Sequence, residues 1–291
     1  MHGELKDIIN GFILGDGSVF RDRDYFRFKL TAKDMKYLEW VAELFVRNGI
    51  NTFFSNDKRN DTCILYARTN DIFHGFRKNW YTKINGKTQK IVPKDLELNS
   101  TVLLHWYIGD GCLIRQKENR IPRIVLATNA FSKENINLLI EKLRKIGLNF
   151  YPILSYSGFT KNKCGYILTS KLEDGTPFRF FKIIGFECPK EIKDCYTGNK
   201  GRGSKRHYVK DKWPNEEDRI RIFSNVNGIG KIIKERRGKL KISQGQLAKK
   251  VDTTRDYIKQ IERGRRYPSV PLFKKILSAI KIDISYFLEY T

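Results

Sequence analysis

Two short segments, 94 residues apart, each place a single carboxylate between two glycines at the end of an apolar stretch. The first is "GFILGDGSVF", with its acid at Asp16, and the second is "WYIGDGCLI", with its acid at Asp110. The apolar residues before Asp16 follow the i, i+3, i+4, i+7 spacing of a helix. A carboxylate at the C-terminus of a helix faces the negative end of the helix dipole. The repeated placement therefore favours a cation site, although a single Asp-Gly after a helix is ordinarily a turn.

The elements predicted after each acid recur in the same order, which indicates an internal duplication. Each copy begins with the apolar helix and continues with a strand that alternates apolar and polar side chains, an amphipathic helix, a hairpin and a further helix. The sequence predicts an α+β fold with two pseudo-symmetric αββαββα halves, residues 1–97 and 98–196, followed by an all-α C-terminal domain.

Small polar residues mark where several of these helices begin. Such residues accept hydrogen bonds from the free N–H groups of the first helical turn. The expected caps are Ser100 or Thr101, Ser132 in a loose capping box with Asn135, Ser243 and Thr253.

The charge balance points to a polyanionic partner. The 291 residues include 56 Lys and Arg against 32 Asp and Glu, a formal net charge of +24. Nucleic acid is the first candidate and an anionic membrane surface the second. No apolar run near 18 residues and no C-terminal Cys box occurs, so no membrane partner is expected. Acids in the first residues argue against a signal peptide, and an intracellular location (cytoplasm, nucleoid or organelle matrix) is expected.

Five cysteines without any CxxC spacing indicate reduced thiols. Cys188 and Cys195 have no nearby His to complete a ligand set, so the sequence disfavours a zinc site.

The segments "INGFILGDG" (9–17) and "LLHWYIGDG" (103–111) resemble the two nine-residue motifs of the LAGLIDADG homing endonucleases, in their single-chain, two-repeat form. The resemblance covers roughly residues 1–196. The second motif departs from the first because His105 stands where the first has Gly11, and packing or an interhelical hydrogen bond is its expected role.

This resemblance implies that the two motif helices pack side by side and that their acids meet. The implied metal site, for Mg²⁺ or Mn²⁺, comprises Asp16, Asp110, Gly15 and Gly109. The implied activity is hydrolysis of both strands of a long double-stranded DNA site, leaving short 3′ overhangs. The family also places a basic residue near each acid, and by position these are Lys171 and Arg68. An ordinary surface cation is the alternative for both.

The same resemblance implies that the two sheets form a saddle on the major grooves of DNA. The side chains expected to face DNA there are Tyr25, Arg27, Lys29 and Thr31 in the first half and Arg123 in the second. Arg and Lys suit phosphates and guanine edges. An ordinary solvated sheet face is the alternative.

Residues 197–225 are expected to form a basic linker. Its first part, "TGNKGRGSKRHYVKDKW", has six Lys or Arg, three Gly and few apolar residues, which predicts a flexible segment. Two hypotheses remain open: it follows DNA phosphates, or it is only a solvated tether.

Residues 226–291 are expected to form a helix-turn-helix domain. The segment "ISQGQLAKKVDTTRDYIKQIERGRRYPS" resembles that of phage repressors and Xre-like regulators. In this family the start of the recognition helix enters the major groove. The positions that match DNA-facing ones are Gln244, Thr254, Arg255, Asp256 and Gln260. A protein-interaction domain is the alternative.

Together these features predict a monomeric, Mg²⁺-dependent, site-specific DNA homing endonuclease. Its extra domain would add DNA contact or regulate its own expression. Two other classes stay open: a maturase that binds intron RNA during splicing, and a transcriptional regulator built on an inactive nuclease scaffold. Retention of both acids argues against the latter.

Overall fold

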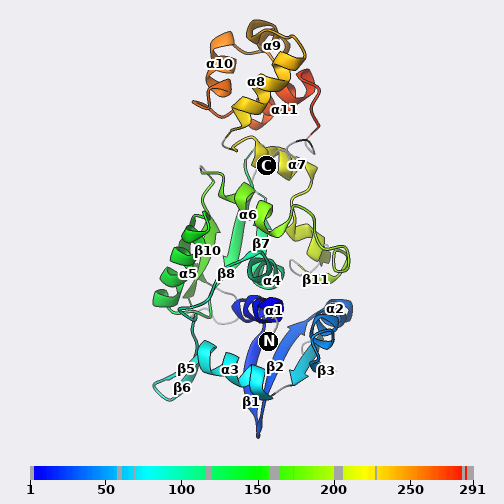
Figure 1. The fold of residues 1–291 in the computed structure, drawn as a ribbon, viewed down its shortest axis with the longest axis vertical. Coiled ribbons are helices and arrows are strands. Elements are labelled where there is room, and N and C mark those ends of the chain that lie inside the picture. The colour runs from blue at the N-terminus through cyan, green and yellow to red at the C-terminus, as the bar shows by residue number, and fades with distance from the viewer. Residues whose placement is uncertain are drawn as a thin grey trace. The chain divides into compact units, whose positions relative to one another are not determined.

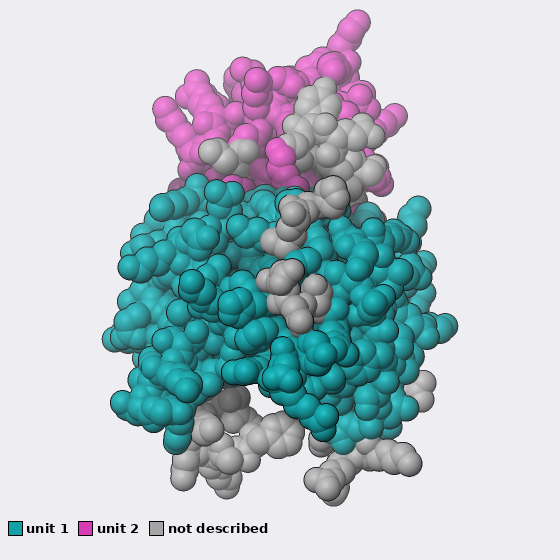
Figure 2. All heavy atoms as spheres, turned by 60° about the horizontal axis from the view of Figure 1, so that its bottom comes forward, with its two compact units in different colours: residues 1–112, 125–169, 183–213 teal, residues 113–124, 170–182, 214–291 magenta. Residues whose placement is uncertain are grey.

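The computed structural model describes residues 3–57, 61–68, 70–115, 120–156, 164–172, 174–199, 206–226, 228–283 and 286. The chain divides into two compact units (Figure 2). The first contains residues 1–112, 125–169 and 183–213, and the second contains residues 113–124, 170–182 and 214–291. No described helix is long and apolar enough to cross a membrane.

The first half follows the predicted order and ends in a short hairpin (Figure 1). Its first sheet is antiparallel, with strand order β1-β2-β4-β3. The elements are α1 (Gly3–Leu14), β1 (Ser18–Asp22), β2 (Tyr25–Ala32), α2 (Met35–Val46), β3 (Asn51–Asp57), β4 (Thr62–Arg68), α3 (Asn70–Trp80), β5 (Tyr81–Ile84) and β6 (Lys87–Lys90).

The second half repeats this order, and its sheet has the matching strand order β7-β8-β10-β9. The predicted α+β duplication is therefore confirmed. Another hairpin and a short 3-10 helix follow. The elements are α4 (Ser100–Asp110), β7 (Gly111–Ile114), β8 (Arg123–Ala127), α5 (Lys133–Lys145), β9 (Phe150–Tyr156), β10 (Cys164–Ser170), α6 (Thr176–Ile184), β11 (Tyr196–Asn199), β12 (Arg206–Tyr208) and η1 (Val209–Lys212).

The alternating pattern of β2 separates a core face from an outer face. Phe28 and Leu30 are buried under α2 and α3, and the Phe28 ring lies 5.1 Å from Phe45 and 6.1 Å from Phe73. Because side chains alternate along a strand, the polar residues between them lie on the opposite face of the sheet. The hairpin expected around "NDKRND" is confirmed by the antiparallel pairing of β3 with β4.

The helix starts follow the predicted chemistry but not always the predicted residue. Ser132 and Ser243 cap α5 and α9 as expected, and Ser243 has the full capping box with Gln246. The cap of α4 is Asn99, one residue before the expected Ser100 or Thr101. Short polar side chains compete for these positions, so sequence alone does not select among adjacent candidates.

The C-terminal helices pack around a small apolar core whose members include Ile233, Leu247, Ile261 and Phe273. The cap of the third of these helices, α10, is Thr254 rather than the expected Thr253. The last residues of the chain, "DISYFLEYT", whose pattern predicts a further short helix, fall mostly outside the described residues. The elements are α7 (Glu216–Phe223), α8 (Ile229–Lys239), α9 (Gln244–Lys250), α10 (Arg255–Glu262) and α11 (Val270–Ala279).

The flexible linker predicted for the segment after residue 196 is wrong where the structure describes it. Residues 206–212 form β12 and η1, and residues 216–223 form α7. Val209 and Trp213 are buried, and Trp213 donates a hydrogen bond to the carbonyl of Gly185 at 3.1 Å. The high Lys content of the segment outweighed two apolar residues, Val209 and Trp213, that anchor it within the first unit.

Candidate active site

The site is built on the close contact of α1 with α4, two helices that lie side by side in the first unit (Figure 1). A Cβ atom on Gly11 would lie 2.7 Å from the His105 Cβ and 2.7 Å from the Val102 carbonyl, so only glycine allows this approach. Gly15 faces Gly109 one turn further on, where an added Cβ would lie 3.5 Å from the Gly109 Cα.

His105 fills the space that Gly11 leaves. Its ring lies 4.7 Å from Phe12 and 5.6 Å from Trp40, and Nδ1 has no hydrogen-bond partner among the described residues. Burial lowers the pKa of His105 to about 4, so the ring is neutral near pH 7. Its contribution is packing of the helix pair.

The two acids come together where the paired helices end. Asp16 lies two residues after the end of α1, and Asp110 is the last residue of α4. A Cβ on Gly109 would lie 3.3 Å from the Asp16 amide nitrogen and 3.8 Å from its Oδ2. Both side chains keep a solvent-accessible side, and Asp16 is the more exposed. Burial and the charge of Asp16 raise the pKa of Asp110 to about 7, and burial raises that of Asp16.

Two half-buried lysines stand beside this pair of acids. The Lys90 ammonium donates to the carbonyls of Ile13 at 2.7 Å and of Gly17 at 3.3 Å, beyond the end of α1. The charges of Lys212 and Lys90 lower the pKa of Asp16 against the effect of burial. Burial in turn lowers the pKa of both lysines, and the two acids raise it.

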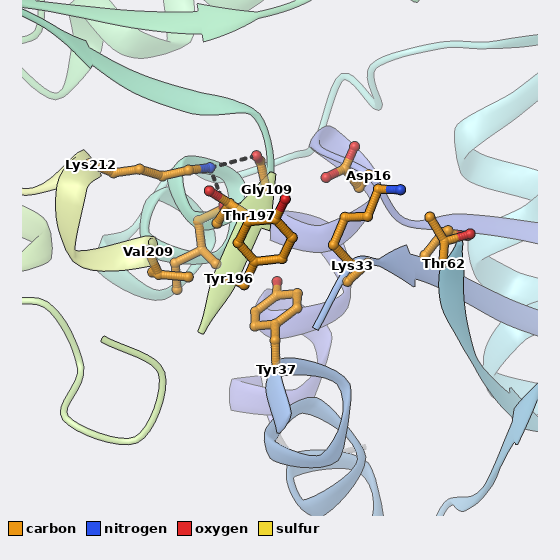
Figure 3. A pocket seen from close by; sticks show the side chains of 12 residues that line it. Asp16, Lys33, Tyr37, Thr62, Gly109, Tyr196, Thr197, Val209 and Lys212 are labelled. Atoms are coloured by element: carbon orange, nitrogen blue, oxygen red, sulfur yellow. Dashed lines mark hydrogen bonds between the residues drawn. The ribbon is translucent and has the colours of Figure 1, made fainter. Parts of the chain in front are cut away.

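Lys212 occupies the corresponding place at the end of α4. Its ammonium donates to the carbonyls of Ile108 at 2.6 Å and of Gly109 at 2.9 Å (Figure 3). Each lysine thus satisfies carbonyls that a helix end leaves free and places positive charge at the negative end of a helix dipole. These cations explain how the fold tolerates an acid at each helix end.

The segment with Lys90 is anchored by a residue of the second half, and the segment with Lys212 is anchored by a residue of the first half. The segment after Lys90 is held in the second half, where the Val92 amide donates to Asn135 Oδ1 at 2.6 Å. Asn135 therefore does not return a bond to the Ser132 amide, as a full capping box would require. The strand that leads to Lys212 is held in the first half, where the Tyr196 amide donates to Asp34 Oδ2 at 2.7 Å.

A pocket of about 220 Å³ opens beside Asp16 (Figure 3). Its walls include Thr31, Lys33, Tyr37 and Lys212. The Tyr37 hydroxyl is buried and has no hydrogen-bond partner among the described residues. Burial and the charge of Asp16 raise the pKa of Tyr37, so its hydroxyl stays neutral. Because Lys33 and Lys212 line this pocket and Tyr37 is neutral, the pocket can accept an anionic group.

Sequence reasoning did not single out Lys90 or Lys212. Lys90 lies in an unassigned hairpin, and Lys212 lies in the segment expected to be a linker. One sequence feature could have indicated these two lysines. After the last helix of each half, a lysine is followed within three residues by a proline, in "KIVP" and in "KWP".

The two expected basic residues, Arg68 and Lys171, lie at the ends of strands. The Arg68 guanidinium lies over the Tyr25 ring, 3.5 Å from its centroid. Lys171 follows β10, is exposed, and belongs to the second unit, whereas both acids belong to the first. Their catalytic role remains a prediction.

The residues expected to face DNA lie on strands as the pattern indicated. Tyr25, Arg27, Lys29 and Thr31 alternate along β2 on its outer face, opposite the buried Phe28. Arg123 begins β8 and is half-buried.

In the helix-turn-helix region, Arg255 and Asp256 are exposed in the first turn of α10, and Gln260 is half-buried further along it. The Thr254 hydroxyl accepts a hydrogen bond from the Tyr257 amide at 3.2 Å as the helix cap.

The Gln244 amide takes part in a network inside the domain. It donates to Glu262 Oε2 at 2.7 Å, and Glu262 also receives Arg237 Nε at 2.6 Å. This network fixes the relative positions of α8, α9 and α10 and leaves the Gln244 side-chain oxygen available.

The oxygen-only chemistry of the paired acids fits a hard divalent cation. Mg²⁺ uses one or two carboxylates together with water and phosphate oxygens. Asp16 and Asp110 supply the carboxylates. The elevated pKa of Asp110 reflects its burial and then the charge of Asp16, and a cation would offset that charge. No cluster of three or more His, Cys, Asp or Glu occurs in the described part of the chain, and this site offers two carboxylates. The cysteines described there are free thiols.

Paired helices that end in acids, within a duplicated αββαββα scaffold, define a LAGLIDADG protein. The model of the LAGLIDADG DNA endonuclease family matches residues 6–162, more than half of the chain, and the chain belongs to that family. A helix-turn-helix family model matches residues 233–287.

A curated relative is the uncharacterized protein MJ1098 of Methanocaldococcus jannaschii, which is 27% identical over 158 residues. The match covers 50% of this chain and 58% of that protein, so the chain spans little more than half of the relative's length.

The similar solved structures include two homing endonucleases and a DUF199/WhiA protein. I-WcaI bound to its DNA recognition sequence is 21% identical, with a TM-score of 0.46 over 62% of this chain and 80% of that one. I-DmoI in complex with DNA and Mn is 13% identical, with a TM-score of 0.38 over 62% and 97%. Full-length DUF199/WhiA from Thermatoga maritima is 13% identical, with a TM-score of 0.41 over 97% and 93%.

Proposed function

We propose that the protein is a site-specific endonuclease that cleaves both strands of double-stranded DNA with the help of Mg²⁺ or Mn²⁺. The observation that carries this proposal is the proximity of Asp16 and Asp110 beside two half-buried lysines. The family match and the net charge of +24 support DNA as the substrate.

In this proposal Asp16 and Asp110 hold the metal, and the backbone at Gly15 and Gly109 borders it. A bound divalent ion lowers the pKa of a water molecule and stabilises the leaving oxygen of the phosphodiester. The chain's own groups supply the rest. Lys212 uses two of its three N–H donors on the carbonyls of Ile108 and Gly109, so the third is free to bind a phosphate oxygen.

We further propose that residues 1–97 and 98–196 act as two halves of one DNA-binding surface and that the chain works as a monomer. The outer faces of the two sheets contact the major grooves, through Tyr25, Arg27, Lys29, Thr31 and Arg123. Residues 226–291 add a second contact through Gln244, Thr254, Arg255, Asp256 and Gln260, either extending the site or binding a regulatory sequence.

The test is selection of cleaved sequences from a random duplex library in Mg²⁺, with Asp16→Asn and Asp110→Asn in parallel. We expect cutting at one long site by the wild type, no cutting in EDTA, and binding without cutting by either variant. Tight binding by a wild type that never cuts would refute the nuclease and favour a regulator. Restored splicing of a host intron by the non-cutting variants would favour a maturase.

A further inference from the structure

The outer face of the first sheet carries a row of aromatic rings as well as positive charge. The strand register places Lys29 beside Tyr66, and Tyr66 beside Phe53. The Phe53 and Tyr66 rings are stacked, with centroids 5.1 Å apart and an interplanar angle of 18°. Phe20 on β1 meets Tyr66 edge-on at 6.2 Å. Four strands thus present one ordered aromatic surface.

Part of this surface is open to solvent. Phe53 is 40% exposed and Tyr25 is 37% exposed. Exposed aromatic groups that form a continuous surface commonly mark a contact with a partner. The positive residues among them, Arg27, Lys29 and Arg68, match a polyanion.

The two arginines on this face are already engaged. Arg27 pairs with Asp22 at 2.8 Å, and its guanidinium lies 5.3 Å from the centre of the Phe53 ring. Arg68 lies flat over the Tyr25 ring at 3.5 Å. Reading guanine requires a free guanidinium fork aimed at O6 and N7. These two arginines instead keep the rings in position, and their positive charge attracts DNA phosphates.

Each of these two rings, Phe53 and Tyr25, has at least one covered face. A neighbouring ring or a guanidinium lies over Phe53 and Tyr25, whereas an unpaired base needs an open ring face to stack on. Ring edges instead suit small apolar groups. The apolar group that duplex DNA presents in its major groove is the 5-methyl group of thymine.

We infer that the outer face of the first sheet selects a thymine-rich stretch of duplex DNA through ring contacts to thymine methyl groups. Phe53 and Tyr25 provide these contacts, and Arg27, Arg68 and Lys29 bind the flanking phosphates. This inference rests on the proposed function, because it specifies the sequence read by one half of that DNA site.

The test begins with selection of bound duplexes from a random library in EDTA, where the DNA stays uncut. We expect a block of A·T pairs in one half of the selected site. Uracil is then substituted for each thymine of that block, which removes only the methyl group. Each contacted methyl should contribute about fourfold to the wild-type Kd.

Two alanine variants of neighbouring residues provide the matched comparison. Phe53→Ala should lose the discrimination at the thymines that Phe53 contacts and keep it at those that Tyr25 contacts. Phe54→Ala removes a ring of similar exposure, 41%, from the next position of the same strand, whose side chain lies on the other face. It should discriminate thymine from uracil as the wild type does.

The possible outcomes separate this inference from the proposed function. A selected duplex site with no thymine preference, or one in which uracil binds as tightly, would overturn the inference alone. Tighter binding to the unpaired strand than to the duplex would replace it with base stacking. Failure of the wild type to select any duplex would remove both proposals.

Discussion

At the scale of single residues, the site depends on partly buried charges that compensate one another. Two acids stand at helix ends where the dipole disfavours them, and Lys90 and Lys212 provide the opposing charge. Breaking one member of such a set leaves its partners buried without compensation. The lysines should therefore matter to folding of the site as well as to its chemistry.

Replacement of Lys212 by methionine keeps the aliphatic stem and removes the charge and the donors. We expect cleavage to fall by about 10²-fold or more, because a single electrostatic donor at a reacting centre has an effect of this size. DNA affinity at low salt should change little. The measurement is single-turnover cleavage of the selected duplex alongside a binding titration.

Lys171→Met is the control for this substitution, because Lys171 is exposed and was the lysine expected from the sequence. It should cleave like the wild type. The opposite pattern, with Lys171→Met inactive and Lys212→Met active, would restore the sequence-based prediction.

His105 should make stability depend on pH. Its pKa is about 4 when folded and about 6.5 when unfolded, so the unfolded chain binds the additional proton between these values. Its contribution therefore remains whole above pH 6.5 and is lost as the pH falls toward 4, by up to about 3 kcal/mol. Urea unfolding of the wild type and His105→Gln across this range should show a shallower loss in the variant. Parallel profiles would contradict a buried neutral histidine.

At the scale of elements, the contact of α1 with α4 determines where the acids lie. Sequence reasoning anticipated this helix pair because the glycines and acids of each motif lie within one short segment. It did not anticipate the lysines, because Lys90 and Lys212 reach the acids through hairpins anchored far away in sequence, by Val92 on Asn135 and Tyr196 on Asp34. Local periodicity contains no information on such anchors.

Two glycines of the first motif should differ in their tolerance of alanine. In Gly11→Ala the new methyl would lie 2.7 Å from both the His105 Cβ and the Val102 carbonyl, so the helices must separate. The free energy of unfolding should fall by about 1–3 kcal/mol. In Gly15→Ala the nearest atoms lie 3.5 Å away, and stability should be nearly unchanged. Equal effects of the two substitutions in urea titrations would refute this account of the interface.

At the scale of the whole molecule, the excess of positive charge is distributed over both units, which fits two separate DNA contacts. The sequence predicted the α+β duplication and the C-terminal helices, because both follow from apolar periodicity and capping residues. It misjudged the basic segment near residue 206, because a run of Lys and Arg outweighed Val209 and Trp213, which are buried.

If the C-terminal helices contact DNA phosphates, their exposed basic residues should affect the salt dependence of binding. Arg255→Ala, at the exposed start of α10, should reduce the slope of log K against log salt by about one. Lys231→Ala, on the exposed side of α8, should leave the slope unchanged. Equal slopes for the wild type and Arg255→Ala would argue against a phosphate contact at that position.

The crosswise anchoring of the lysine segments has a consequence for recombination between related proteins. Each half carries its own acid, Lys90 lies at the end of the first half and Lys212 lies after the second. The segment that carries each lysine is nevertheless anchored by the more distant half. In a chimera that joins the first half of one protein to the second half of another, each hairpin meets an anchoring residue from the other protein. This mismatch arises even if the helix interface packs well. Exchange of specificity between relatives should therefore succeed when each hairpin and the residue that anchors it, equivalent to Asp34 or Asn135, come from the same protein.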